Sequence, residues 1–122
     1  MHTFSRLAPA LVAALCCLVG AAAAPHRHHA TAPQTTTAKV AVSNTKFEPR
    51  TLRVKAGTTV VWENTEGAHT VTADNGAFES DTLSAGESYS HKFDKPGRYS
   101  YYCTFHGSKG GHDMAGVVIV TK

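Results

Sequence analysis

The stretch of sequence that decides the fold and chemistry of this chain is YYCTFHGSKGGHDM, residues 101–114. It brings together three side chains that can bind a metal: the thiol of Cys103, the imidazole of His106 and the thioether of Met114. A second imidazole, that of His69, lies upstream. Glycines at positions 107, 110 and 111 let the intervening chain curl without Cβ clashes, so the donors can converge.

This donor set predicts a copper site. Two His, one Cys and a weakly bound Met are the ligands of proteins that hold copper for electron transfer. Soft sulfur donors favour copper, and the Met sulfur is a poor ligand for zinc. We therefore expect one Cu(I)/Cu(II) ion bound by His69, Cys103, His106 and Met114. His112, two residues before Met114, is an alternative axial ligand, unless it is simply a solvent-facing loop residue.

The N-terminus has the layout of a secretory signal peptide. Residues 1–6 carry one positive charge, and residues 7–24 are almost wholly apolar and end in small residues. We place cleavage after Ala23, so that residues 1–23 are removed. An uncleaved membrane anchor is the alternative, although the apolar run is short and contains Pro9. We expect export to the periplasm or the extracellular or cell-envelope space, with a membrane tether if the signal stays uncleaved.

Cleavage leaves Cys103 as the only cysteine, because Cys16 and Cys17 lie within the signal. A single cysteine cannot form an internal disulfide, and an odd thiol in an oxidising compartment is a liability unless something occupies it. A bound metal would occupy it. The alternative, a buried and inert thiol, leaves His106 and Met114 without a role.

Residues 24–38 are expected to form a flexible tether. They contain no large apolar residue and cannot bury enough surface to repay the entropy of ordering. Three histidines in this segment, His26, His28 and His29, could capture copper loosely. A merely polar linker is the alternative reading.

Residues 39–122 are expected to form one all-β domain. Short alternating or β-branched runs are separated by turn-forming residues, and no segment has a convincing helical period. Many short strands at this spacing favour a sandwich or a barrel. The expected strands are residues 39–43, 51–55, 58–63, 69–73, 88–93, 98–103 and 117–121.

Alternation along residues 99–103 assigns the two faces of that strand. Tyr99, Tyr101 and Cys103 share one face, which we expect to point into the core, and Tyr102 points outward. Tyr99, two residues after Gly97, could also pin a turn with its hydroxyl group. Trp62 is expected to pack in the core.

Composition and length exclude several functions. The formal net charge is +3 and the basic residues are scattered, so nucleic acid is an unlikely partner. The chain is too short for two-site copper enzymes, which need further domains and additional histidine clusters. Nothing in the sequence is typical of a small-molecule substrate site. We therefore expect a monomer that is not an enzyme.

Residues 39–122 resemble the cupredoxins, in particular the plastocyanin–halocyanin type. The resemblance implies an eight-stranded Greek-key β-sandwich with copper at one end. It also implies that His69, Cys103 and His106 are equatorial ligands and that Met114 is axial. The matching segments are FEP at 47–49, GTTVVWEN at 57–64, AHTV at 68–71, GRY at 97–99, YC at 102–103, His106 and MAGV at 114–117.

The resemblance also implies how electrons enter and leave. In such proteins the C-terminal ligand His serves as an electron port within an apolar patch, a role that would fall to His106 beside Phe105 and Ala68. Tyr102 offers a second route outward, so redox protein partners are expected near His106 and possibly Tyr102. Two departures from the family pattern are Thr70 where Asn is common and the absence of an acidic docking cluster. The segment from His106 to Met114 is also longer than in plastocyanin.

Three functions compete. The leading hypothesis is an exported mononuclear type 1 (blue) copper protein that carries single electrons between redox partners. An exported protein for copper storage or delivery is the alternative, although a closed site with a thiolate suits retention more than release. A metal-free structural sandwich would leave Cys103 unexplained.

Overall fold

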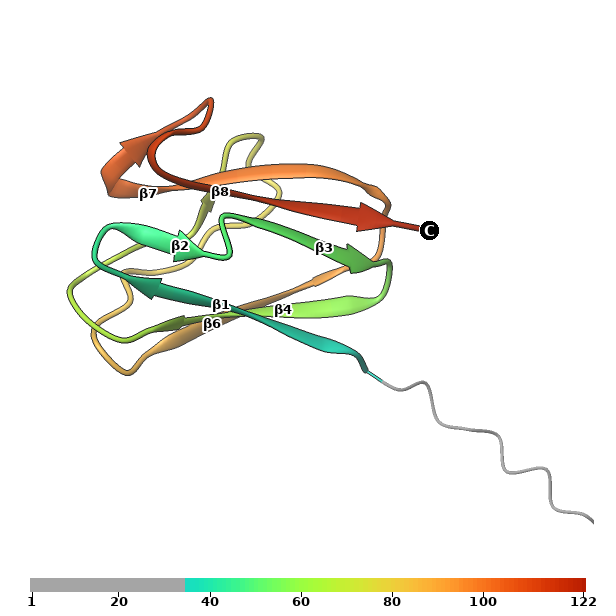
Figure 1. Cartoon of the computed structure of the whole chain (residues 1–122), viewed down its shortest axis with the longest axis horizontal. Coiled ribbons are helices and arrows are strands. Elements are labelled where there is room, and N and C mark those ends of the chain that lie inside the picture. Colours follow the sequence, from blue (N-terminus) through green and yellow to red (C-terminus); the bar gives the residue numbers. More distant parts are fainter. Residues whose placement is uncertain (1–34) are drawn as a thin grey trace, which may run out of the picture. The chain divides into compact units, whose positions relative to one another are not determined.

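The computed structural model describes residues 35–122. This part of the chain contains eight strands, which form two four-stranded sheets (Figure 1). This confirms the all-β sandwich. No helix in this part of the chain is long and apolar enough to cross a membrane. The strands are β1 (Thr37–Ser43), β2 (Lys46–Glu48), β3 (Thr51–Lys55), β4 (Thr58–Asn64), β5 (Thr72–Ala73), β6 (Ser88–Phe93), β7 (Gly97–Ser108) and β8 (His112–Thr121).

The sheets have mixed strand directions. One has the order β2-β1-β4-β6 and the other the order β3-β8-β7-β5. The pairs β1–β4 and β3–β8 are parallel, and the remaining neighbours are antiparallel. Parallel neighbours cannot be joined by a hairpin, so the chain crosses between the two sheets. Cys103 and Met114 lie on β7 and β8, adjacent antiparallel strands that a hairpin joins.

The core lies between the inner faces of the two sheets and is rich in aromatic side chains. Trp62 of β4 is fully buried, and its ring centroid lies 5.3 Å from that of Tyr101 on β7 and 5.7 Å from that of Phe78. Along β4 every second residue from Thr58 is buried. This alternation is what a strand with one face on the core requires, and it confirms Trp62 as a core residue.

The predicted faces of β7 are also confirmed. Tyr101 and Cys103 are buried and Tyr99 packs against the core, whereas Tyr102 lies on the other side and is partly exposed. The hydroxyl of Tyr99 donates a hydrogen bond of 2.8 Å to the carbonyl of Lys95, so it does pin the turn before β7.

Gly116 on β8 makes room for the buried ring of Tyr101, its partner in the strand register. A Cβ atom at position 116 would lie only 2.5 Å from the Tyr101 hydroxyl oxygen. Burial raises the pKa of Tyr101 to about 12. The side chain is therefore a neutral phenol that packs in the core, two residues before Cys103 on the same strand.

Several strand limits differ from the sequence prediction. β1 begins at Thr37, two residues before the expected start, and β4 extends to Asn64. The three-residue strand β2 was not predicted, because a segment this short carries no readable alternation. It is held by pairing with the end of β1, where Val42 lies opposite Phe47.

The expected continuous strand at residues 69–73 is wrong. Only β5, Thr72–Ala73, is a strand there, and His69 makes a single bridge to Leu83. Side chains have taken the backbone donors in between: Thr70 N–H points at Cys103 Sγ, and Val71 N–H donates to Ser80 Oγ over 2.8 Å. A strand ladder cannot form where its donors are used elsewhere.

The glycine-rich segment after Cys103 is a hairpin of extended strands, where the sequence indicated a curled loop. β7 continues to Ser108 and β8 already begins at His112, so Met114 lies within β8 and not before it. Figure 1 shows this hairpin at the upper left, rising away from the strands of the sandwich. The expected signal (1–23), the tether histidines and the two upstream cysteines lie outside the described residues.

Candidate metal centre

Three of the four predicted donors meet at one end of the sandwich. One ligand atom from each of His69, Cys103 and His106 lies within 4.8 Å of the other two. Cys103 Sγ is 3.8 Å from His69 Nδ1 and 3.6 Å from His106 Nδ1. Donors that share one metal ion at about 2.0–2.3 Å are separated by distances of this order. The cluster therefore has the right size for a single ion.

The cluster is sheltered on one side and open on the other. Cys103 is fully buried and His69 is 3% exposed, whereas His106 is exposed. Burial lowers the pKa of His69, and the neighbouring His106 lowers it further. A neutral imidazole has the free lone pair that a metal ligand needs.

The loop that carries His69 is fixed by Asn64, the last residue of β4. Asn64 is buried, and its Nδ2 donates to the carbonyls of Gly67 at 2.8 Å and Leu83 at 2.9 Å. Gly67 has a positive φ of 70°, and a Cβ atom there would lie 3.1 Å from His69 Nε2. Together Asn64 and Gly67 set the place of the His69 ring.

The thiol of Cys103 is oriented by Thr70. The Thr70 N–H lies 3.4 Å from Cys103 Sγ, a distance suited to a sulfur acceptor. The Thr70 hydroxyl oxygen accepts from the N–H of Thr104 at 2.9 Å and lies 3.0 Å from the Thr104 hydroxyl. Thr70 thus ties the segments of His69 and Cys103 together, so a side-chain hydrogen bond links them although Asn is absent at this position.

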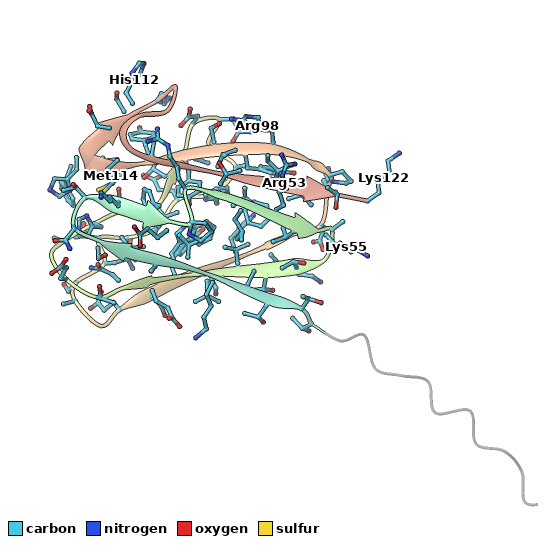
Figure 2. The ribbon with its side chains drawn as sticks, viewed as in Figure 1. Arg53, Lys55, Arg98, His112, Met114 and Lys122 are labelled. Carbon is cyan, nitrogen blue, oxygen red and sulfur yellow. The ribbon has the colours of Figure 1, made fainter. Side chains whose placement is uncertain are left out.

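Met114 and His112 occupy different places in the hairpin. Met114 is 1% exposed and borders a hollow that His106 also lines. His112 is exposed and lies at the hairpin tip, away from Met114 (Figure 2). Its ring is close to Gly110, since a Cβ atom there would lie 3.5 Å from His112 Cδ2. Of the two candidate axial ligands, Met114 is therefore the one on the cluster side.

The open side of the cluster forms a hollow of about 490 Å³. Phe105, 57% exposed, is the only large apolar side chain exposed among residues 35–122. Its ring centroid lies 6.3 Å from that of His106. The hollow is lined by Asn44, Thr45, Glu66, Gly67, Ala68, His69, Phe105 and His106.

Residues 10–120 match the family of cupredoxin-like domains. The chain belongs to the cupredoxin family. Cupredoxins bind one copper ion, and the donors in this chain fit that cofactor, because a buried thiol without a disulfide partner faces two imidazole nitrogens.

Individual cupredoxins show the same likeness. Chloroplastic plastocyanin of Tetradesmus obliquus is 41% identical over 86 residues, which cover 61% of this chain and 57% of that protein. Halocyanin of Natronomonas pharaonis is 41% identical over 80 residues, 61% of this chain and 47% of that protein. The chain thus spans about half the length of these two relatives. An oxidised variant of amicyanin superposes with a TM-score of 0.61 at 28% identity, covering 75% of this chain and 87% of the amicyanin chain.

Sequence reasoning found the donors but missed their supports. Asn64 was part of the motif that carried the resemblance, yet no role was assigned to it. A signal was present, because a polar residue at a core-facing position of a strand must satisfy its hydrogen bonds locally. Thr104 gave no such signal.

Proposed function

We propose that this cupredoxin is an exported mononuclear type 1 copper protein that carries single electrons between redox protein partners. His69, Cys103, His106 and Met114 are its copper ligands in this proposal. The observation that carries it is the fully buried Cys103 thiol with an imidazole Nδ1 on each side, at 3.8 Å and 3.6 Å.

Bound copper supplies a one-electron couple. The chain supplies a cage that need not rearrange when the charge of the ion changes. Asn64, Thr70 and Thr104 hold the ligand segments by hydrogen bonds that involve no ligand side chain except the Cys103 sulfur. Such supports keep ligands oriented and adjust the electron density on the sulfur. A cage of this kind suits repeated electron transfer better than metal release.

Electrons pass through the open side in this proposal. His106 is exposed beside Phe105, and exposed apolar groups on small proteins commonly mark partner sites. A transient redox encounter needs only a small interface. Tyr102 lies on the outer face of β7 and is joined to Cys103 by a peptide bond, so it offers a second route.

The rest of the chain is assigned to export. In this proposal residues 1–23 are a signal peptide, residues 24–38 a tether and residues 39–122 the copper domain, which acts as a monomer outside the cytoplasm. The apolar run at 7–24 with its small-residue end supports this division.

The direct test is to add Cu(II) to the purified protein without residues 1–23 and record its visible spectrum. We expect an intense blue colour from charge transfer by the Cys103 thiolate, and reversible cycling between Cu(II) and Cu(I) without loss of copper. The variant Cys103→Ser should be colourless.

The matched control is His91→Gln, which changes a histidine outside the cluster and should stay blue. A Cys103→Ser protein that kept the colour would overturn the site assignment. Loss of copper on each reduction would favour storage or delivery over electron transfer.

A further inference from the structure

The pairing of β7 with β8 is interrupted beside the metal centre. The regular register ends at Tyr102 opposite Ala115 and resumes only at Gly107 opposite Asp113. Beyond this irregularity two residue pairs remain, the second being Ser108 opposite His112. A two-stranded hairpin of this size is marginally stable by itself. Met114 is the residue between the regular ladder and this short segment, the hairpin tip (residues 107–113).

The backbone of the hairpin tip is also conformationally costly. Gly110 and Gly111 have φ values of 88° and 83°. Glycine has many accessible conformations in the unfolded chain, so fixing these two residues in one conformation costs more conformational entropy than fixing other residues. Asp113, directly before Met114, has a positive φ of 56°, an uncommon conformation for a residue with a Cβ atom. Something outside the tip must therefore hold it in one arrangement.

Two charged side chains, each next to a different strand, form hydrogen bonds with the backbone of the hairpin tip. Arg50, just before β3, donates from Nη2 to the carbonyl of Gly111 at 2.6 Å. Asp74, just after β5, accepts the N–H of Gly110 at Oδ2 over 2.9 Å. β3 and β5 are the two edge strands of their sheet, so the grip reaches the tip from both sides.

Both gripping residues are themselves anchored to the sheet. The carbonyl of Arg50 accepts the N–H of Val117 at 2.8 Å, and the N–H of Asp74 donates to the carbonyl of Ser100 at 2.9 Å. Asp74 Oδ1 is buried without a hydrogen-bond partner among the described residues. A buried carboxylate oxygen is costly to leave unpaired. The hydrogen bond from Gly110 N–H to Oδ2 offsets part of this cost and explains why the carboxylate lies here.

We propose that Arg50 and Asp74 are positioning residues that fix Met114 at the metal centre by clamping the hairpin tip. The clamp rests on the proposed function, since Met114 matters to copper only if it is a ligand. A Cβ atom at Gly107 would collide with the Met114 carbonyl, so the tip and Met114 are in direct contact. Motion of the tip is thereby passed to the thioether.

The test uses pairs of variants that change charge equally. Asp74→Ala removes the acceptor, whereas Asp74→Asn loses the same charge but keeps an oxygen for Gly110. Arg50→Met removes the donor, whereas Arg53→Met removes an exposed arginine of β3 whose side chain makes no hydrogen bond or ion pair among residues 35–122. Figure 2 shows Arg53 on its strand, well away from the hairpin tip.

Two measurements follow on each variant. In the metal-free protein, nitrogen-15 relaxation should show greater mobility of residues 107–113 for Asp74→Ala and Arg50→Met than for their controls. In the copper form, the same two variants should have a reduction potential above that of their controls, because a Met114 that is held less firmly is a weaker donor to Cu(II). Their electron paramagnetic resonance spectra should change in parallel.

Equal mobility within each pair would overturn the clamp itself. Greater mobility with unchanged potential and resonance spectrum would reduce Arg50 and Asp74 to a purely structural role. A wild-type protein that binds no copper would contradict the proposed function, and the metal-free measurement would still decide whether the clamp holds the tip.

Discussion

Met114 differs from the other proposed ligands in how the chain holds it. His69 and Cys103 are held by hydrogen bonds at their own segments: Asn64 fixes the loop that carries His69, and Thr70 N–H points at Cys103 Sγ. Met114 has a thioether that accepts hydrogen bonds only weakly. Its place depends on burial and on the strand that carries it.

Replacing Met114 with Leu should leave copper bound, because the thiolate and the two imidazoles provide most of the affinity. The reduction potential should rise, since a donor to Cu(II) is lost. Voltammetry of the purified copper protein measures this. His112→Ala is the matched control and should leave the potential where it was. The reverse result, with His112→Ala shifting the potential and Met114→Leu not, would make His112 the axial group.

Strand β6 carries a histidine into apolar surroundings. The His91 ring centroid lies 5.0 Å from that of Phe78 and 4.8 Å from that of Phe93. Burial lowers the pKa of His91 from its usual 6.5, although Asp94 acts in the opposite direction. The folded protein therefore binds this proton less readily than the unfolded chain does.

It follows that His91 makes the protein less stable in acid. The stability of the fold with a neutral His91 is fully present above about pH 6.5. It decreases as the pH falls below that value, because His91 is protonated in the unfolded chain before it is protonated in the folded protein. Urea unfolding of the metal-free protein at about pH 8 and about pH 5 should show a smaller loss of unfolding free energy for His91→Gln than for wild type. Equal losses in both proteins would show that His91 does not contribute.

The strands could be predicted from the sequence where local pattern decides them, as in β3, β4 and β6. The pattern failed at residues 69–73, because backbone N–H groups there bond to the side chains of Cys103 and Ser80. The alternation of apolar and polar residues does not indicate such contacts. The grouping of His69, Cys103 and His106 was within reach, since ligand chemistry identifies the donors by type alone.

The grip on the hairpin tip was out of reach for a different reason. Arg50 is 61 residues from Gly111 along the chain, and Asp74 is 36 residues from Gly110. Neither residue belongs to a motif, and a surface Arg or Asp is ordinarily solvated. Only the fold, which puts β3 and β5 at the two edges of one sheet, brings them to the same turn.

The sandwich as a whole places the proposed metal centre where its core meets solvent. Cys103 and Met114 belong to the core cluster around Trp62, whereas His106 and Phe105 are exposed. Phe105 is 57% exposed, so few core contacts depend on it. Changes there should affect partners more than folding.

Replacing Phe105 with Glu should slow electron exchange with the physiological partner by about tenfold, since a central apolar contact is worth about 1–2 kcal/mol in an interface. The blue spectrum should persist, because residue 105 is not a ligand. Stopped-flow mixing with the partner measures the rate. Ser90→Glu, an equal charge change at an exposed position of β6, is the control and should exchange electrons normally. A large loss of thermal stability with unchanged exchange would remove Phe105 from the docking surface.

The parallel pairing of β3 with β8 has a practical use. Lys55 lies opposite Thr121, and Ala56 N–H donates to the Thr121 carbonyl, so the chain's last residues are held at the end where β1 also begins (Figure 1). Met114 precedes Thr121 on β8 by seven residues, or about 23 Å of strand. A fusion partner or electrode linker joined after Lys122 would therefore leave the exposed His106 end of the sandwich free to face solution.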